Sequence, residues 1–476
     1  MFDNETKQPG LWKRLMIGAA LVIFASASAT AVAAFREVDE VVSAFKENAP
    51  LELGTDLAKT DPGKPQTLMV IGSDKRVNSS DPLADSSARS DTVILVRLDP
   101  GKEATALMSL PRDLKVRIPG HGTDKLNAAF ELGGPKLTLK TVKELTGLRI
   151  NHVINVDFRG FRDAVNTIGC VYVDIDRRYY NADTSFAAIN IPAGYQRLCG
   201  DRALEYARFR REDNDLVRGA RQQDFLREAK GQVGNGKLIS DRRKLVRIFG
   251  KYTSSDIRNR AEVLRLLKLA VFSADQPIRE VHFEGEIGES FVTASSRGVR
   301  KLAKQFLGVE ETKGPRGKLK PTGEKPRVGA EFTGLEKIPA EGRDQARQAR
   351  SQTARFPIWY PTVRTKRALF AGPPRVYRLK APGGKKYPAY RMVIKRGLVG
   401  DYYGVQGTTW RDPPILADPQ EKRKIGKRTF ELHFDGDRLR LVAWRTRTGV
   451  YWISNTLLQT LTKRQMLTIA RSTRPL

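Results

Sequence analysis

The order of apolar and polar positions predicts alternating strands and helices over the first two thirds of the chain. Apolar runs of strand length occupy 67–72, 92–98 and 104–110, and each borders charged residues. Further strands are predicted at 151–156, 170–175, 281–283 and 291–293, and helices at 125–133, 137–146, 160–167, 241–249, 258–272 and 296–307. This alternation predicts an α/β domain at 65–309 whose mixed central sheet is flanked by helices.

The pattern changes at residue 310. Residues 310–354 are rich in Lys, Arg, Gly, Pro and Glu, which predicts a basic linker. Residues 355–476 return to order, with strands at 375–380, 387–395, 429–434, 438–445 and 450–453 and a helix at 463–471. We interpret this region as a small α+β accessory domain that holds polymer or cell wall through basic and aromatic residues such as Tyr402, Tyr403 and Trp410.

Residues 15–35 contain no charged side chain over 21 positions. As a helix this run is about 32 Å long and spans a bilayer core. Lys13 and Arg14 precede it and acidic residues soon follow, so the positive-inside rule leaves a cytoplasmic tail of residues 1–14. A cleavable signal peptide is the alternative, because the run ends in small residues. Either way we expect everything from the connector 36–64 onward to work outside the cytoplasm, and the favoured form is a single-pass membrane protein.

The charge of the chain is strongly positive. Among 476 residues, 84 Lys and Arg face 53 Asp and Glu, a formal net charge of +31. Such an excess implies an acidic partner, which could be nucleic acid, an anionic membrane or an anionic polymer. An extracytoplasmic location removes most of the case for nucleic acid.

Two cysteines, Cys170 and Cys199, lie in a compartment where disulfides persist. Each borders a glycine in a segment expected to be ordered. A bridge closing a loop of about 30 residues is one outcome, and two separate buried thiols are the other.

The densest group of charges reads ALEYARFRREDNDLVRGARQQDF. Arg208 and Arg210 lie two apart after an apolar run, and if this segment is a strand they project from one face of it. Beyond the acidic turn the pattern is helical, and Arg218, Arg221 and Gln222 share a helix face. Converging guanidinium groups suit an anion that accepts bidentate hydrogen bonds, and phosphate is the leading candidate. A solvated charged turn is the alternative, although such a turn has no need of arginine over lysine.

Charged residues also border the first three predicted strands. Asp74 follows the first strand, Asp91 directly precedes the second, and Arg112 follows the third. These positions fall at one end of the predicted sheet, and ligands of α/β sheets gather outside strand ends. We therefore expect the three side chains to face one site.

Six short motifs run through residues 65–309. They are GSDKR at 72–76, RSDT at 89–92, PRD at 111–113, KLN at 125–127, IGCV at 168–171, and the stretch from Ala203-Leu204 to Gln222-Gln223. In order and spacing they resemble the LytR-CpsA-Psr family of cell-envelope proteins, and the single N-terminal anchor fits that family too. The family more usually has a second glycine where Cys170 stands. With Cys199, the chain resembles an actinobacterial, disulfide-bearing type with an extra C-terminal domain.

The resemblance implies a Mg²⁺-dependent phosphotransferase, with Mn²⁺ as an alternative metal. Such an enzyme moves a glycopolymer from a polyprenyl-diphosphate carrier to peptidoglycan and has a hydrophobic groove for the lipid. The positions that correspond are Asp74 and Asp91 for the metal; Arg89, Arg112, Arg208, Arg210 and Arg218 around the diphosphate; and Lys125, Arg221 and Gln222 as further substrate contacts. Asp215 corresponds to a carboxylate near these arginines, which would orient Arg218 or act as a general base.

This chemistry suits the residue types. Mg²⁺ prefers one or two carboxylates together with phosphate oxygens, and it retains several waters. Arginines stabilise the charge that develops on a transferring phosphoryl group. Two alternatives use the same residues: a polyprenyl-diphosphate phosphatase, with water replacing the acceptor hydroxyl, and a non-catalytic binder of polyprenyl phosphates or anionic wall polymers.

Overall fold

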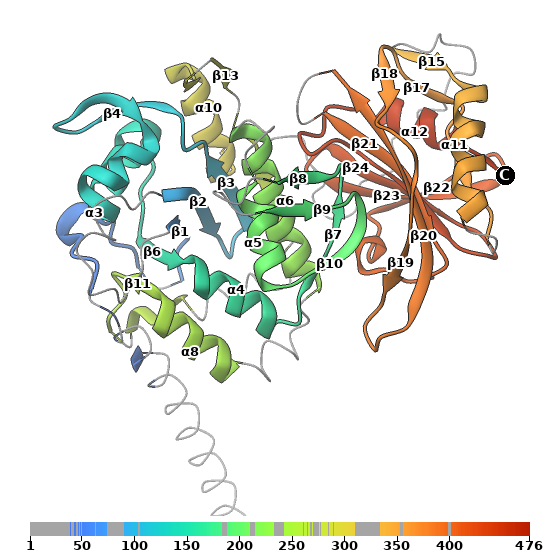
Figure 1. Ribbon diagram of the computed structural model, residues 1–476. Helices are drawn as coiled ribbons and strands as arrows, with labels where there is room; N and C mark the ends of the chain where they lie inside the picture. The colour runs from blue at the N-terminus through green and yellow to red at the C-terminus, as the bar shows by residue number, and fades with distance from the viewer. Residues whose placement is uncertain are drawn as a thin grey trace, which may run out of the picture.

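The computed structural model contains two domains, coloured blue to yellow and orange to red in Figure 1. It describes residues 39, 42–43, 46, 48, 50–61, 63–73, 90–102, 105–182, 188–209, 215–232, 242–259, 261–263, 265–266, 269, 276, 278–283, 285–288, 290–309, 334–352, 356–397 and 401–476. The predicted transmembrane segment 15–35 lies outside these residues. Within the described part of the chain, no helix has the length and apolar character needed to cross a membrane.

A six-stranded mixed sheet forms the centre of the N-terminal domain. Its strand order is β11 (Thr253–Ser255), β6 (His152–Asp157), β1 (Gln66–Ser73), β2 (Ser90–Leu98), β3 (Thr105–Leu110) and β12 (Ile278–Val281). β1 runs antiparallel to β2 and parallel to β6, whereas β3 runs antiparallel to β2 and parallel to β12. The prediction of a mixed central sheet is confirmed.

Helices cover both faces of this sheet (Figure 1). The helices are α3 (Leu126–Thr146), α4 (Phe158–Thr167), α5 (Gly200–Arg208), α6 (Asp215–Gln232), α8 (Arg242–Tyr252) and α10 (Ser296–Leu307). In β3, Met108 and Leu110 share one core with α3 and α10. The alternate residue Ser109 meets α6 at Gly219, where a Cβ would lie 3.1 Å from the serine Oγ. The predicted break at Gly133-Gly134 is confirmed as a kink inside α3.

The segment carrying Arg208 is helical, so its prediction as a strand is wrong. α5 ends at Arg208, and residues 210–214 lie outside the described part. Ala203, Tyr206 and Phe209 are buried at intervals of three residues, which is helical spacing. The two-residue spacing of the arginines concealed this period. The helix predicted after the acidic turn is confirmed as α6.

Short hairpins complete the N-terminal domain. The smaller elements are η1 (Gly54–Asp56), β4 (Lys115–Ile118), β5 (Gly122–Lys125), β7 (Val171–Ile175), β8 (Tyr179–Asn181), β9 (Ile189–Ile191), β10 (Gly194–Leu198), β13 (Glu286–Ile287) and β14 (Val292–Thr293). β7 pairs antiparallel with β10, and Cys170 and Cys199 flank this pair at one end. The two cysteines form a disulfide, with Cα atoms 4.5 Å apart, so the bridged alternative is confirmed.

The C-terminal domain is built on a large antiparallel sheet. Its elements are β15 (Leu335–Lys337), α11 (Pro339–Gln352), β16 (Trp359–Tyr360), β17 (Val363–Thr365), β18 (Ala368–Phe370), β19 (Arg375–Lys380), β20 (Lys386–Arg396), β21 (Tyr402–Thr408), η2 (Pro414–Leu416), β22 (Glu421–Ile425), β23 (Arg428–Asp435), β24 (Arg438–Arg445), β25 (Val450–Ser454), α12 (Lys463–Ser472) and β26 (Arg474–Pro475). The main sheet runs β18-β20-β21-β25-β24-β23-β22, with β19 also pairing with β20. The α+β prediction fits this architecture.

The boundary predicted for the basic linker extends too far. Residues 335–352 form β15 and α11, whose Ala346 and Ala349 lie in the core of the C-terminal domain. The many arginines of α11 lie on its exposed face, so composition alone concealed an amphipathic helix. The rest of the predicted linker, 310–333, lies outside the described residues.

The two domains share a buried interface formed by β7 and β10. Asp174 of β7 accepts hydrogen bonds from Arg391 at 2.6 Å and from Gln406 at 2.5 Å. Tyr172 donates its hydroxyl to the Lys380 carbonyl at 2.7 Å. Around these contacts lies a common apolar core: Tyr172, Tyr195, Leu379, Ala389, Ile415, Leu416, Leu441, Ala443, Val450 and Trp452. The C-terminal domain is therefore packed against the N-terminal one rather than tethered to it.

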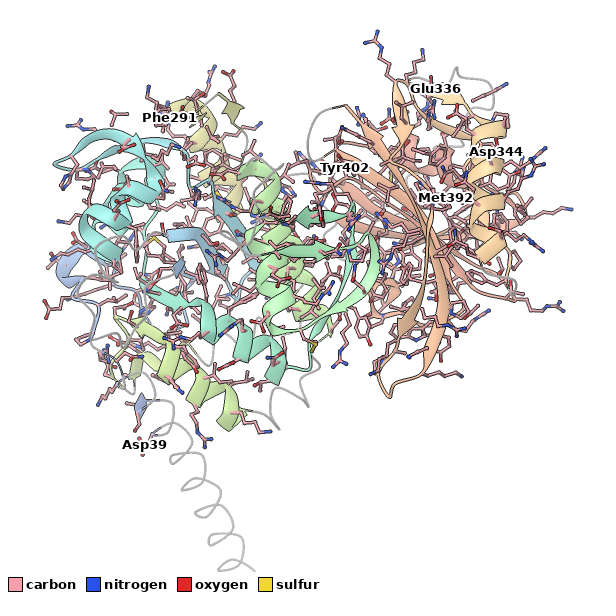
Figure 2. The ribbon with its side chains drawn as sticks, viewed as in Figure 1. Asp39, Phe291, Glu336, Asp344, Met392 and Tyr402 are labelled. Atoms are coloured by element: carbon pink, nitrogen blue, oxygen red, sulfur yellow. A yellow bond between two sulfur atoms is a disulfide. The ribbon has the colours of Figure 1, made fainter. Side chains whose placement is uncertain are left out.

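The aromatic residues predicted to hold polymer are used for packing. Tyr403 is fully buried in the core of the C-terminal sheet. The Trp410 ring packs against Tyr172 of the N-terminal domain, at 5.4 Å between centroids. Tyr402 lies on the side of its domain that faces the N-terminal domain (Figure 2). The centroid of its ring is 5.3 Å from the guanidinium carbon of Arg177. The prediction that they form a polymer-binding surface is not supported.

A second contact joins α6 to the C-terminal domain. Arg227 of α6 forms ion pairs with Glu280 of β12 and with Asp435 of β23. Glu228, the next residue of α6, accepts a hydrogen bond from Arg440 of β24 at 2.7 Å. The C-terminal half of α6 is thus held by charged side chains from the other domain.

Candidate active site

The candidate site lies at one edge of the central sheet. Gly72 pairs with Thr92, and Ser73 pairs with Ser90 across a bulge. Leu110, the last residue of β3, pairs with Val93. The ends of β1 and β3 and the start of β2 therefore meet at this edge, as predicted for the residues that border them.

Several of the predicted site residues lie outside the described part of the chain. Asp74, Arg89 and Arg210 lie outside the described residues, and for Asp91 only the backbone is described. The strand register nevertheless puts Asp91 between Ser90 and Thr92, across from the end of β1. The backbone of Asp91 therefore lies at the predicted edge of the sheet.

Four charged residues are linked by successive contacts beside this edge, one of them through a backbone N–H group. The Asp113 backbone N–H donates to Asp215 Oδ2 at 2.7 Å, and Arg218 Nη2 contacts Asp215 Oδ1 at 2.6 Å. Arg112 Nε lies 3.6 Å from Asp113 Oδ2. The loop after β3 and the first turn of α6 are thereby joined, and Arg112 and Arg218 are brought to one place.

Burial sets the electrostatics of this group. Only 7% of the Asp215 side chain and 6% of the Arg218 side chain are exposed. Burial raises the pKa of Asp215, and Asp113 adds to that effect, whereas Arg218 and Arg112 oppose it. Because both carboxylate oxygens of Asp215 are already engaged, the geometry favours a role in orienting Arg218 over a role as general base.

Lys125 approaches the same group from β5. Its Nζ lies 3.3 Å from Asp113 Oδ1 and 5.7 Å from the centroid of the Phe291 ring. About a third of the Lys125 side chain remains exposed. The ammonium group is thus held at the rim of the site, where it can reach an anion.

Gln222 and Arg208 lie along the same sheet edge, beside β2 and the start of α4. Gln222 Nε2 donates to Thr92 Oγ1 at 2.9 Å and to the Ala207 carbonyl at 3.1 Å. The Arg208 guanidinium lies 4.1 Å from the Phe158 ring centroid. Gly72 fits between these residues, because a Cβ there would lie 3.3 Å from the Thr92 Cβ. Both predicted side chains therefore reach the edge that carries Asp91.

Arg221 does not fit its predicted contact with substrate. The side chain is fully buried and donates to the Phe209 carbonyl at 2.6 Å. Its guanidinium lies 4.8 Å from the Tyr179 ring and 5.4 Å from the Tyr206 ring. Aromatic faces attract a cation, so Arg221 anchors α6 to α5 inside the domain.

A separate group of possible metal ligands lies at the domain interface. Among the described residues, Glu280, His282 and Asp435 place ligand atoms within 4.8 Å of one another. Arg227 already forms ion pairs with both carboxylates. The Arg227 guanidinium thus supplies the positive charge in this group. The spacing of residues in the sequence did not indicate the group, because its members come from two domains.

Comparison with known proteins points to one family. Residues 25–305 match the model of the LytR_cpsA_psr family. The polyisoprenyl-teichoic acid–peptidoglycan teichoic acid transferase TagT of Bacillus subtilis is 32% identical over 233 residues, which cover 47% of this chain and 71% of TagT. The corresponding transferase TagU of Oceanobacillus iheyensis is 32% identical over 177 residues, covering 36% of this chain and 54% of TagU. The crystal structure of B. subtilis TagT is similar with a TM-score of 0.41 at 22% identity, covering 55% of this chain and 98% of that structure.

Proposed function

The chain belongs to the LytR-CpsA-Psr family, and we propose that it moves a glycopolymer from a polyprenyl-diphosphate carrier to peptidoglycan. The two transferases to which it is similar bear the names of enzymes that join teichoic acid to peptidoglycan. Substrate, acceptor and partners of this chain are part of the proposal. The charged edge of the central sheet supports it independently.

The observation that carries the proposal is the fixed arrangement of Arg112, Asp215 and Arg218. Buried carboxylate contacts hold Arg218 in place before any ligand arrives. Preorganised cations stabilise developing charge without a reorganisation cost at the moment of reaction. A diphosphate needs several such cations, and Arg208 and Lys125 are the further described candidates at the rim.

The reaction is a phosphoryl-group transfer. The acceptor hydroxyl oxygen forms a bond to the phosphorus that carries the glycan, and the bond from that phosphorus to the bridging oxygen breaks. The products are a glycan phosphodiester on the acceptor and a polyprenyl phosphate, and the hydroxyl proton passes to solvent. Charge grows on the equatorial and bridging oxygens, where Arg112 and Arg218 would stabilise it.

We propose that a divalent metal binds at the sheet edge. Asp91 lies in β2 across from the end of β1, and Asp74 follows that end in sequence. Two carboxylates at one edge, next to arginines that bind phosphate, are the donor set that Mg²⁺ shares with phosphate oxygens. When bound, Mg²⁺ would offset the charge of the diphosphate; Mn²⁺ would serve in the same way.

We place the enzyme outside the cytoplasm, anchored by residues 15–35. The uncharged run and the flanking charges support this location. It also explains how a disulfide between Cys170 and Cys199 would persist.

One experiment tests the proposal against both alternatives. The purified full-length chain is incubated in detergent with a short-chain polyprenyl-diphosphate glycan, Mg²⁺ and peptidoglycan oligomers. Mass spectrometry should detect the glycan phosphodiester on the oligomer, together with polyprenyl phosphate. Phosphorylated glycan released only in free form would indicate a phosphatase, and binding without turnover would indicate a non-catalytic binder.

A further inference from the structure

The C-terminal domain carries most of the net positive charge of the chain. Residues 334–476 contain 30 Lys and Arg but only ten Asp and Glu, which is +20 of the total +31. Among the described residues of this domain, 20 Lys and Arg are exposed and five Asp and Glu. Arg375, Arg391 and Arg440 contact the N-terminal domain, and none of them is among these exposed cations.

One part of this charge is concentrated at the end of the sheet. β22 is the last strand in the order of the main sheet and forms a hairpin with β23. Ile425 pairs with Arg428, so Gly426 and Lys427 form the tip. Residues 422–428 contain five Lys and Arg among seven positions. Lys422, Lys424 and Lys427 are exposed.

The fold brings two more arginines to this hairpin. Arg428 donates to the Arg471 carbonyl at 2.5 Å and to Thr473 Oγ1 at 2.8 Å. The hairpin is thereby fixed to the C-terminal end of α12 and to the start of β26. Arg471 and Arg474, which are exposed, lie on either side of that attachment. We call Lys422, Lys424, Lys427, Arg471 and Arg474 the basic edge.

The cations of the basic edge form no ion pair with described carboxylates, although Lys422 lies opposite Glu431 in the β22–β23 ladder. No described carboxylate lies within ion-pair distance of any of the five. The pKa of Arg428, which lies between them, is lowered first by burial and then by the positive charges of Arg474 and Arg471. Like charges held together in this way repel one another, and an anion bound across them would remove that cost.

Protection of an edge strand explains only part of this pattern. Lysines on an edge strand prevent pairing with other chains, and Lys422 and Lys424 serve that purpose. Arg471 and Arg474 belong to other elements, and edge protection gives no reason to collect them at the hairpin. Arginine favours phosphate, because its planar group donates two parallel hydrogen bonds.

We propose that the basic edge binds a linear polymer with repeating phosphate groups, at a site separate from the edge of the central sheet. The partner class rests on the proposed function, since teichoic acid, named for the similar transferases, is a polymer of this kind. Cations spaced along a strand edge and around a helix end match charges repeated along a chain better than they match one compact anion. The C-terminal domain would then hold the polymer while the sheet edge acts on its linkage end.

Binding of the full-length chain to fluorescent linear polyphosphate, measured by anisotropy at several salt concentrations, tests the proposal. The variant combines Lys424→Gln, Lys427→Gln, Arg471→Gln and Arg474→Gln. The matched control combines Arg378→Gln, Lys380→Gln, Lys385→Gln and Lys386→Gln, four exposed cations of the β19–β20 hairpin near the opposite end of the sheet. Both variants lose four positive charges, so the total charge of the domain changes equally.

The basic-edge variant should bind polyphosphate at least tenfold more weakly. The slope of log K against log salt concentration should become shallower by about three, because each of the four lost contacts contributes roughly 0.7 to that slope. The control should change by less than twofold. An equal loss in both variants would overturn the proposal, and so would preference for phosphatidylglycerol vesicles over polyphosphate. Because no transfer step is involved, an active-site variant should bind polyphosphate normally, which separates failure here from failure of the proposed enzyme.

Discussion

Asp174 of β7 and Arg391 of β20 form an ion pair of 2.6 Å across the domain interface, with 6% and 1% of their side chains exposed. Trp452 and Gln406 donate to the same carboxylate. The three described side chains that donate to the Asp174 carboxylate therefore all come from the C-terminal domain. The pair couples the stability of one domain to the presence of the other.

Replacing Arg391 with Met should destabilise the whole chain. Removing one partner leaves the Asp174 carboxylate buried without its cation, which costs about 3–5 kcal/mol. Urea unfolding followed by tryptophan fluorescence would measure this loss. Lys395→Met removes an exposed cation from the same strand and should change the free energy of unfolding by less than about 0.5 kcal/mol. Similar losses in both variants would show that the interface pair has no special part.

Arg218 and Asp215 should differ in their effects on transfer. Arg218→Gln removes a cation from the developing charge and should lower kcat by about 10²-fold or more. Asp215→Asn keeps a hydrogen-bonding side chain beside Arg218 and should lower kcat only about tenfold. Initial rates with the polyprenyl-diphosphate glycan would measure both, with the exposed Arg300→Gln as control. A loss for Asp215→Asn as large as for Arg218→Gln would instead indicate a general base.

Transfer should require a divalent metal held at the sheet edge. Chelation should abolish activity, and added Mg²⁺ should restore it. Asp91→Asn removes one carboxylate and should raise the Mg²⁺ concentration needed for half-maximal rate by at least tenfold, because a metal with few protein ligands depends on each of them. Full activity of the chelated enzyme would contradict the proposed metal site.

Loss of the disulfide should weaken the domain interface as well as the N-terminal domain. Cys170 and Cys199 are 29 residues apart and flank β7 and β10, which carry the interface. For a loop of this length the bridge contributes about 3.6 kcal/mol. The double variant Cys170→Ser with Cys199→Ser should lose this amount in urea unfolding without reductant. The original chain in reductant should match the variant, and a difference between them would point to an effect of the substitutions themselves.

His433 should make the protein sensitive to mild acid. Burial, together with Arg440 and Arg445, lowers the pKa of His433 from 6.5 to about 3. A folded-state pKa below the unfolded value means that the unfolded chain takes up the proton first. Stability from this group is therefore present above about pH 6.5 and is lost as the pH falls toward 3. As the pH falls from 6 to 4, the free energy of unfolding should decrease in both proteins. For each pH unit, the decrease should be smaller in His433→Gln than in the original chain by on the order of 1 kcal/mol. Equal pH slopes would show that His433 is already solvated.

The sequence could predict the central sheet because its strands differ sharply from their surroundings. The apolar runs of β1, β2 and β3 end abruptly in charged residues, and burial on both faces produces such runs. The motif after β3 contained Arg112, and the later arginine-rich stretch contained Arg218 and Gln222, which the fold brings to the same site. Local pattern and tertiary structure agree there.

The errors come from features that only tertiary contacts decide. By its position in the sequence, Arg221 shares a helix face with Gln222. In the fold, however, its guanidinium lies against the rings of Tyr179 in β8 and Tyr206 in α5. The composition of α11 resembles that of a linker, and we therefore predicted one. Only three small residues form the buried side of this helix, so it has no run of large apolar residues that would mark it in the sequence. The sequence does not show that the Tyr403 and Trp410 rings take part in packing. Tyr403 lies in the core of the C-terminal domain, and Trp410 packs against Tyr172 of the N-terminal domain.

α6 faces both domains at once, with Asp215 and Arg218 at its start and Arg227 and Glu228 near its end. The C-terminal domain therefore cannot be exchanged as an independent module, because any replacement must again supply partners for two buried charges on a helix of the catalytic domain. Over evolution the strand segments that contact α6 should tolerate little change, whereas the tip of the β22–β23 hairpin, at the opposite end of β23 from Asp435, would be free under the proposed role of the basic edge to follow the chemistry of the polymer.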